Sequence, residues 1–292
     1  MKHPDEIKMT RRQAVAALGS LAVAATGVSR AQESKAPARM ALQLYTLRDP
    51  AKQDLKGTLK KAREMGWEYV QWSGMPDLPA EQIRAALDEA GLKAMAAHTG
   101  VEPFETDFEK SVTFWKTVGV EAVGPGGMMG DCRETLADWL RGAKRFDVLG
   151  AKLREAGLRL TYHNHAGEFE KFPEDPRCKL DILFESTDPK NLSAELDLAW
   201  VKVGNANPAA YIRKCKGRVH QVHAKDVAEG KKGERVKFTP LGQGSLDWND
   251  IFAAGKEAGI EWYIYEQDNG EGSPFDYAKA SYDFLSKRTM GG

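Results

Sequence analysis

The stretch Glu155-Ala156-Gly157-Leu158 ends an amphipathic segment in glycine and leads directly into an apolar, β-branched and aromatic run that reaches His163. The same junction recurs along the chain at Gly66, Gly91, Gly119, Gly217 and Gly259. A glycine just past a helix adopts the left-handed conformation that ends the helix. These junctions therefore predict helices that alternate with strands, which is typical of a parallel sheet.

Working outward from these junctions, the pattern predicts eight strands. They are the runs Met40–Tyr45, Trp67–Trp72, Leu92–His98, Val120–Val123, Leu158–His163, Leu192–Asp197, Arg218–His223 and Glu261–Glu266. Eight strands with helices between them favour a (β/α)8 TIM barrel, and the chain after residue 31 has about the 250 residues typical of that fold. A doubly wound open sheet is the alternative, but it usually has fewer strands and a glycine-rich first turn that this sequence lacks. We therefore predict an α/β barrel domain over residues 40–292.

The first 31 residues differ from the rest of the chain. Arg11-Arg12 precedes an Ala-rich apolar run, and Ser29-Arg30-Ala31 offers the small residues that a signal peptidase requires. Adjacent arginines before such a run are typical of a twin-arginine export signal. We expect residues 1–31 to be a signal peptide and 32–39 a short linker, with the protein exported to the periplasm.

The composition excludes several classes of protein. The 292 residues are 42% hydrophobic, and 42 basic residues balance 42 acidic ones. This balance gives no electrostatic reason to expect a nucleic-acid partner or an anionic membrane surface. Three cysteines are too few for a disulfide framework or a cysteine-based zinc site, and no stretch after residue 31 is apolar enough to span a bilayer. The expected partner is a small molecule, and the sequence leaves the oligomeric state open.

Histidines and acids gather at the predicted strand ends, where TIM barrels carry their active sites. The residues are His98, His163, His165, Glu195, Asp197, His223, Lys225 and Glu266. Imidazoles and carboxylates from successive strands suit a divalent ion such as Mn, Zn, Fe or Co, whereas Ca prefers oxygen ligands alone. The alternative for each residue is an ordinary hydrogen-bonded role in the barrel.

Six motifs resemble those of the sugar phosphate isomerase/epimerase family, within the xylose isomerase-like TIM barrel superfamily that also contains inosose dehydratases and endonuclease IV. They are Gln43–Asp49, Leu160–His165, Glu195–Asp197, His223–Asp226, Leu241–Trp248 and Tyr265–Asp268. The resemblance implies one divalent metal ion held by His163, Asp197, His223 and Glu266, with His165 as the alternative to His163.

The sequence departs from the ketose 3-epimerases of this family at three positions. His163 stands where those enzymes have a glutamate ligand, Trp200 where they have a histidine, and Glu229 where they have an arginine. The groups that hold the substrate in those epimerases are therefore missing, and their particular reaction is not carried over.

The chemistry that the resemblance implies is proton abstraction next to a carbonyl group, which gives an enediolate. Glu266 is the family's usual base, and Glu168 and Glu195 are the local alternatives. Lys225 is a candidate for stabilising an oxyanion, or else is the ion-pair partner of Asp226. His98 is a candidate donor to a substrate oxygen, or else an ordinary histidine at the barrel end.

Aromatic residues at strand ends suit the C–H faces of a sugar. Tyr45, Trp72 and Trp200 are the candidates, and His165 is a further candidate for substrate binding. The loop 124–130 lacks the Lys-Ser/Thr of a phosphate-binding loop and is expected to be a plain βα loop. No Arg/Lys pair stands beside the strand-end motifs, so we expect an unphosphorylated sugar or keto-sugar.

These observations predict a metal-dependent sugar isomerase or epimerase. Two alternatives stay open: a lyase or hydrolase that acts on keto-sugars or glycosides through the same enediolate, and a non-catalytic sugar-binding protein on a barrel scaffold. An endonuclease is disfavoured because it needs more metal ligands and a basic surface.

Overall fold

The computed structural model describes residues 37–230 and 235–289. The predicted signal peptide, residues 1–31, lies outside these described residues, as does most of the expected linker. Among the described residues, no helix combines the length and the apolar character needed to cross a membrane.

Eight parallel strands close into a barrel, which confirms the predicted fold class. In chain order they are β1 (Arg39–Gln43), β2 (Tyr69–Trp72), β3 (Lys93–His98), β4 (Ala122–Gly124), β5 (Arg159–His163), β6 (Ser193–Asp197), β7 (Val219–Ala224) and β10 (Trp262–Tyr265). Each strand pairs with the next in the chain, and β10 pairs with β1 to close the ring.

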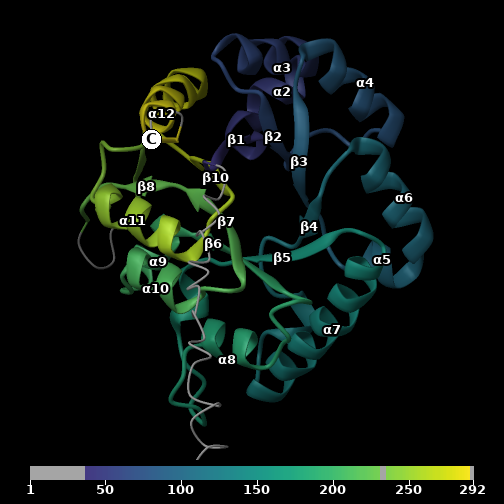
Figure 1. Ribbon diagram of the computed structural model, residues 1–292, viewed down its shortest axis with the longest axis vertical. Helices are drawn as coiled ribbons and strands as arrows, with labels where there is room; N and C mark the ends of the chain where they lie inside the picture. The colour runs from purple at the N-terminus through teal and green to yellow at the C-terminus, as the bar shows by residue number, and fades with distance from the viewer. Residues whose placement is uncertain (1–36, 231–234, 290–292) are drawn as a thin grey trace, which may run out of the picture. The chain divides into compact units, whose positions relative to one another are not determined.

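Helices follow the strands and lie outside the barrel (Figure 1). The α-helices are α2 (Arg48–Gln53), α3 (Leu55–Glu64), α4 (Ala80–Ala90), α5 (Glu102–Thr106), α6 (Phe108–Val118), α7 (Leu136–Glu155), α8 (Lys179–Glu185), α9 (Leu198–Val203), α10 (Pro208–Lys214), α11 (Trp248–Ala258) and α12 (Pro274–Thr289). Three short 3-10 turns are η1 (Leu44–Leu47), η2 (Gly130–Cys132) and η3 (Ala166–Phe169).

The junction glycines behave as the sequence predicts. All six have positive φ angles, between 72° and 112°. Gly91, Gly119 and Gly259 are the left-handed residues that end α4, α6 and α11. The alternation of helix and strand is therefore encoded locally, at residues without a Cβ atom.

Two features differ from the sequence-based expectation. The first strand ends at Gln43 rather than at Tyr45, because the Gln43 side chain accepts a hydrogen bond from the Tyr45 backbone N–H and starts η1. Tyr45 therefore lies in a turn and not at a strand end. A short antiparallel pair, β8 (Asp226–Val227) with β9 (Phe238–Thr239), was not predicted.

The barrel interior changes character along its axis. Side chains two residues apart on a strand share a face, so Ala41 lies below Gln43 on β1, and Trp262 and Ile264 lie below Glu266. Ala41, Trp262 and Ile264 are buried in an apolar cluster. The interior is thus apolar at the level of these residues and polar at the C-terminal end, where the candidate site lies.

Candidate functional site

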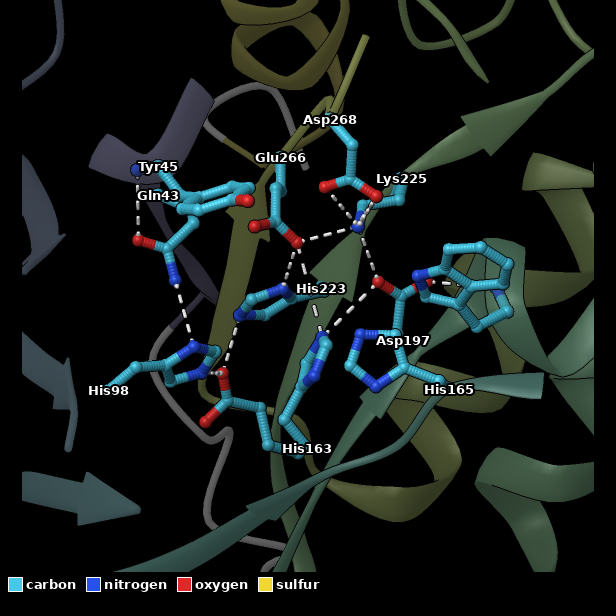
Figure 2. Close-up of polar contacts among 12 residues, drawn as sticks. Gln43, Tyr45, His98, His163, His165, Asp197, His223, Lys225, Glu266 and Asp268 are labelled. Carbon is cyan, nitrogen blue, oxygen red and sulfur yellow. Dashed lines mark hydrogen bonds and ion pairs between the residues drawn. The ribbon is translucent and has the colours of Figure 1, made fainter. Parts of the chain in front are cut away.

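Four buried side chains from neighbouring strands meet at the C-terminal end of the barrel. His163 ends β5, Asp197 ends β6, His223 lies on β7 and Glu266 follows β10. Each offers one ligand atom, and these atoms all lie within 4.8 Å of one another. Figure 2 shows the four side chains pointing toward one another. We call them the four-ligand centre.

The spacing of the ligand atoms suits a metal ion. His163 Nε2 is 3.3 Å from Asp197 Oδ2, and His223 Nδ1 is 2.8 Å from Glu266 Oε2. A tetrahedral ion with bonds of about 2.1 Å holds its ligands about 3.4 Å apart. Two imidazoles and two carboxylates are donors that favour Zn, Mn, Fe or Co. His165 lies outside this group, so the geometry brings His163 rather than its alternative into the centre.

Lys225 places a buried ammonium group against the centre. Its Nζ lies 3.0 Å from Asp197 Oδ2, 2.7 Å from Glu266 Oε2 and 3.0 Å from Asp268 Oδ1, and the residue is 1% exposed. Its partners are therefore these three carboxylates and not Asp226, which the sequence had offered as the alternative. Asp268, at the end of the Tyr265–Asp268 motif, was not predicted as a site residue.

The charges of the centre follow from burial and from these neighbours. Burial and the nearby His223 lower the pKa of His163 to about 3. Burial also disfavours a charged His223, but the carboxylates of Glu195 and Glu266 outweigh it and raise the pKa of His223 to about 10. Burial disfavours an ionised Asp197, yet Lys225 and His163 lower its pKa to about 2.

Glu195 lies behind the centre and is fully buried. Its Oε1 is 2.9 Å from His98 Nε2 and 2.5 Å from His223 Nε2, and accepts a hydrogen bond from Gln71 at 2.9 Å. Its Oε2 accepts one from Gln221 at 2.7 Å. Because donors engage both oxygens, this position suits orienting His223 rather than touching a substrate.

Sequence reasoning missed three buried glutamines in this network: Gln43, Gln71 and Gln221. Gln43 donates to Gln71 Oε1 at 2.8 Å, and its amide nitrogen is 3.5 Å from His98 Nδ1. The available signal was a single amide on the inward face of an otherwise apolar strand end, as in Leu42-Gln43-Leu44.

Glu168, the other candidate base, closes the turn η3. The side chain is 8% exposed; its Oε1 accepts from the Tyr162 hydroxyl at 3.0 Å and its Oε2 from the His165 backbone N–H at 3.0 Å. Both oxygens are therefore engaged within this part of the chain. His165 is exposed, with its ring 4.9 Å from that of His163.

The three candidate aromatic residues have different surroundings. Tyr45 is 37% exposed, and the Arg48 guanidinium lies 4.1 Å from its ring. Trp72 is 5% exposed. Trp200, on α9, lies 5.8 Å from Lys225 Nζ and 5.5 Å from the His165 ring. Tyr45 and Trp200 are thus the two that stand beside accessible parts of the site.

Asp226 accounts for the Leu241–Trp248 motif. Its Oδ2 accepts hydrogen bonds from the backbone of Gly242 at 2.9 Å and Gly244 at 3.2 Å, and from Trp248 Nε1 at 2.8 Å. A Cβ atom on Gly244 would stand 2.6 Å from the Asp226 carboxyl carbon, so only glycine allows this approach. The motif is therefore a loop anchor next to the site.

Residues 59–288 match the family model of the xylose isomerase-like TIM barrel. Among curated proteins, the chain is 27% identical over 164 residues to an inosose dehydratase from Lacticaseibacillus casei, which covers 51% of this chain and 54% of the relative. The chain thus spans about half the length of the curated relatives it matches.

Solved structures show the same fold. A sugar phosphate isomerase/epimerase from Parabacteroides distasonis superimposes with a TM-score of 0.71 at 22% identity, covering 91% of this chain and 98% of the other. The IolI protein, solved with a bound zinc atom, superimposes with a TM-score of 0.64 at 15% identity, covering 85% of this chain and 98% of the other.

Proposed function

The chain belongs to the xylose isomerase-like TIM barrel family, and from this premise we propose that it is a metal-dependent enzyme acting on an unphosphorylated sugar or keto-sugar. The proposed step is removal of a proton from a carbon atom next to a carbonyl group, as in sugar isomerases and epimerases. Lys225, the ammonium group at the centre, is held by three carboxylates and is poorly suited to bind a phosphate group.

The observation that carries the proposal is the four-ligand centre. Its two imidazoles and two carboxylates come from adjacent strands and lie within 4.8 Å of one another. A divalent ion bound by these residues would polarise substrate oxygens and stabilise the negative charge that develops on them.

Glu266 is the residue best placed to accept the proton. Its Oε2 is held by His223 and Lys225, and Figure 2 shows its other oxygen outside these contacts, on the side of Tyr45. Burial alone would raise its pKa, but Lys225 and His223 hold the pKa of Glu266 well below its usual range. Glu266 is therefore in its basic form at neutral pH, whereas Glu195 and Glu168 have both oxygens engaged by donors.

Lys225 is suited to stabilise the developing oxyanion. Burial disfavours its charged form, but Asp197, Glu266 and Asp268 outweigh burial and raise the pKa of Lys225. A protonated Nζ next to two of the four ligand residues can donate a hydrogen bond to a substrate oxygen as negative charge appears on it.

Elimination of water from the adjacent carbon is the second candidate reaction. Inosose dehydratases are the curated relatives that the chain matches, and His163 and Trp200 depart from the ketose 3-epimerase pattern. Both reactions begin with the same proton abstraction, so the same residues serve either one. They differ in whether the neighbouring carbon is reprotonated or loses a hydroxyl group.

The first test measures bound metal by plasma mass spectrometry in protein purified without chelator. We expect about one divalent ion per chain and its loss in Asp197→Asn, because asparagine keeps the hydrogen bond to the Trp200 backbone but removes the ligand charge. Asp268→Asn, outside the four-ligand centre, is the matched control and keeps the ion. An unaltered metal content in Asp197→Asn contradicts the proposal.

The second test follows the reaction by NMR in D2O with metal-loaded protein and a panel of ketoses, keto-sugars and inososes. Deuterium incorporation with formation of an isomeric sugar identifies the isomerase or epimerase. Deuterium incorporation with loss of water identifies the dehydratase. If no compound exchanges a proton or reacts, the enzyme proposal is wrong and the sugar-binding alternative remains.

A further inference from the structure

A groove of about 460 Å³ lies beside His98 at the C-terminal end of the barrel. Its walls come from residues that follow β2, β3 and β4, such as Ser73, Thr99 and Gly126. The four-ligand centre uses the other side of the ring, from β5 to β10. The groove is therefore a separate space from the centre, at the same end of the barrel.

His98 joins the groove to the centre. One side of its ring faces inward, with Nε2 2.9 Å from Glu195 Oε1, and the ring stacks on His223 at 5.2 Å. The same residue lines the groove, and its side chain is 13% exposed. A molecule bound at the four-ligand centre and extending past His98 would enter the groove.

The lining has the chemistry of a site for a neutral, hydroxylated group. Hydroxyls come from Ser73 and Thr99, and the two charged residues, Glu102 and Arg133, have opposite signs. Further lining residues add glycine backbone groups and the apolar side chains Val101, Met128 and Met129. Polar groups over an apolar floor suit a sugar ring, which has hydroxyls at its edge and C–H faces.

We propose that the groove binds a second, neutral, hydroxyl-bearing group of the substrate, so that the substrate is larger than a single sugar ring. This inference rests on the proposed function for the first ring, which the four-ligand centre would hold. The groove volume of about 460 Å³ falls within the range of about 300–1,000 Å³ found for small-molecule sites.

Gly126 gives direct control over the groove. A Cβ atom there would stand 3.8 Å from His98 Nδ1, an ordinary contact, and its φ is not in the left-handed region. Gly126→Leu therefore fills the groove next to His98 without straining the backbone. Gly167, on η3 and outside the groove, has open space at its Cβ position, so Gly167→Leu is the matched control.

The experiment compares glucose with its disaccharides maltose and cellobiose, by calorimetric titration of the full, metal-loaded chain. Two net hydrogen bonds from the second ring correspond to about tenfold tighter binding, and we expect this gain for at least one disaccharide. Gly126→Leu abolishes the gain and leaves glucose binding unchanged, whereas Gly167→Leu keeps it. Circular dichroism confirms that each variant is folded.

Equal affinity for all three probes, absence of disaccharide binding, or a gain that survives in Gly126→Leu overturns the proposal. Metal content and turnover, measured on the same samples, separate this result from the fate of the proposed function. Tighter disaccharide binding without metal or turnover contradicts the proposed enzyme but keeps the groove. Metal and turnover with equal affinities contradict the groove alone.

Discussion

At the scale of single residues, His223 connects the four-ligand centre to the network behind it. Its Nδ1 is 2.8 Å from Glu266 Oε2, while its Nε2 is 2.5 Å from Glu195 Oε1 and 2.7 Å from Gln71 Oε1. A carboxylate behind a metal-binding histidine fixes the ring orientation and the position of its proton. Glu195 therefore determines which nitrogen of His223 faces the centre.

Glu195→Gln tests this positioning role. The variant keeps the shape of the side chain but removes the charge that orients His223, and we expect metal affinity to fall by about 10–100-fold. Competition with a fluorescent chelator measures the affinity. Glu168→Gln, whose partners are Tyr162 and the His165 backbone, is the control with unchanged affinity. Equal affinities in the two variants contradict the positioning role.

Lys225→Met tests the role of the ammonium group. Methionine fills similar space beside Trp200 and Phe238, so we expect turnover to fall by about 10²-fold or more while the metal stays bound. Steady-state kinetics and metal analysis on the same samples measure both quantities. Lys202→Met removes a half-exposed lysine that pairs with Glu229 and serves as the control. Turnover that stays at the wild-type level, or a loss of activity that merely follows loss of metal, argues against this role.

At the scale of elements, the segment 241–248 depends on one carboxylate. Asp226 is fully buried and accepts hydrogen bonds from Gly242, Gly244 and Trp248 within that segment. The loop joins the β8–β9 pair to α11, so its anchor also fixes where α11 begins.

Asp226→Ala is therefore expected to destabilise the fold strongly. Several buried N–H donors lose their acceptor at once, and the expected loss is about 3 kcal/mol or more in the free energy of unfolding. Urea denaturation measures it. Asp247→Ala removes only the cap of α11, where Asp247 accepts from two backbone N–H groups, and should cost about 1 kcal/mol. If the two variants lose equal stability, the anchor does not have the importance assigned to it.

Predictability also differs between elements. The strand and helix order followed from glycines such as Gly91 and Gly259, because their conformation depends on local geometry alone. The β8–β9 pair escaped prediction because each strand has two residues, too few for a periodic pattern.

The candidate site was predictable only in part. His163, Asp197 and His223 were visible because imidazole and carboxylate groups are rare on inward strand positions. Gln71 and Gln221 were not, because a neutral amide shows its role only when its partner on a distant strand is known.

At the scale of the whole molecule, the export signal proposed for residues 1–31 determines where the barrel works. We expect the double substitution R11K/R12K to leave the protein in the cytoplasm, because the twin-arginine pathway reads the arginine pair. Cell fractionation with immunoblotting measures the distribution, and Arg30→Lys, outside the pair, is the control. Equal periplasmic amounts of the double variant and the wild type rule out this route.

The cations Lys225 and His223 also bear on the order in which the protein is assembled. Asp197, Glu195 and Glu266 are buried carboxylates, and the pKa shifts of His223 and Lys225 keep both of these residues positively charged among them at neutral pH. Unpaired buried charges are costly, so a chain without such partners would need its ion in order to fold. Here the counter-charge is covalently part of the polypeptide, so folding can precede metal loading, and scarcity of the ion would leave a pool of intact barrels ready to be activated.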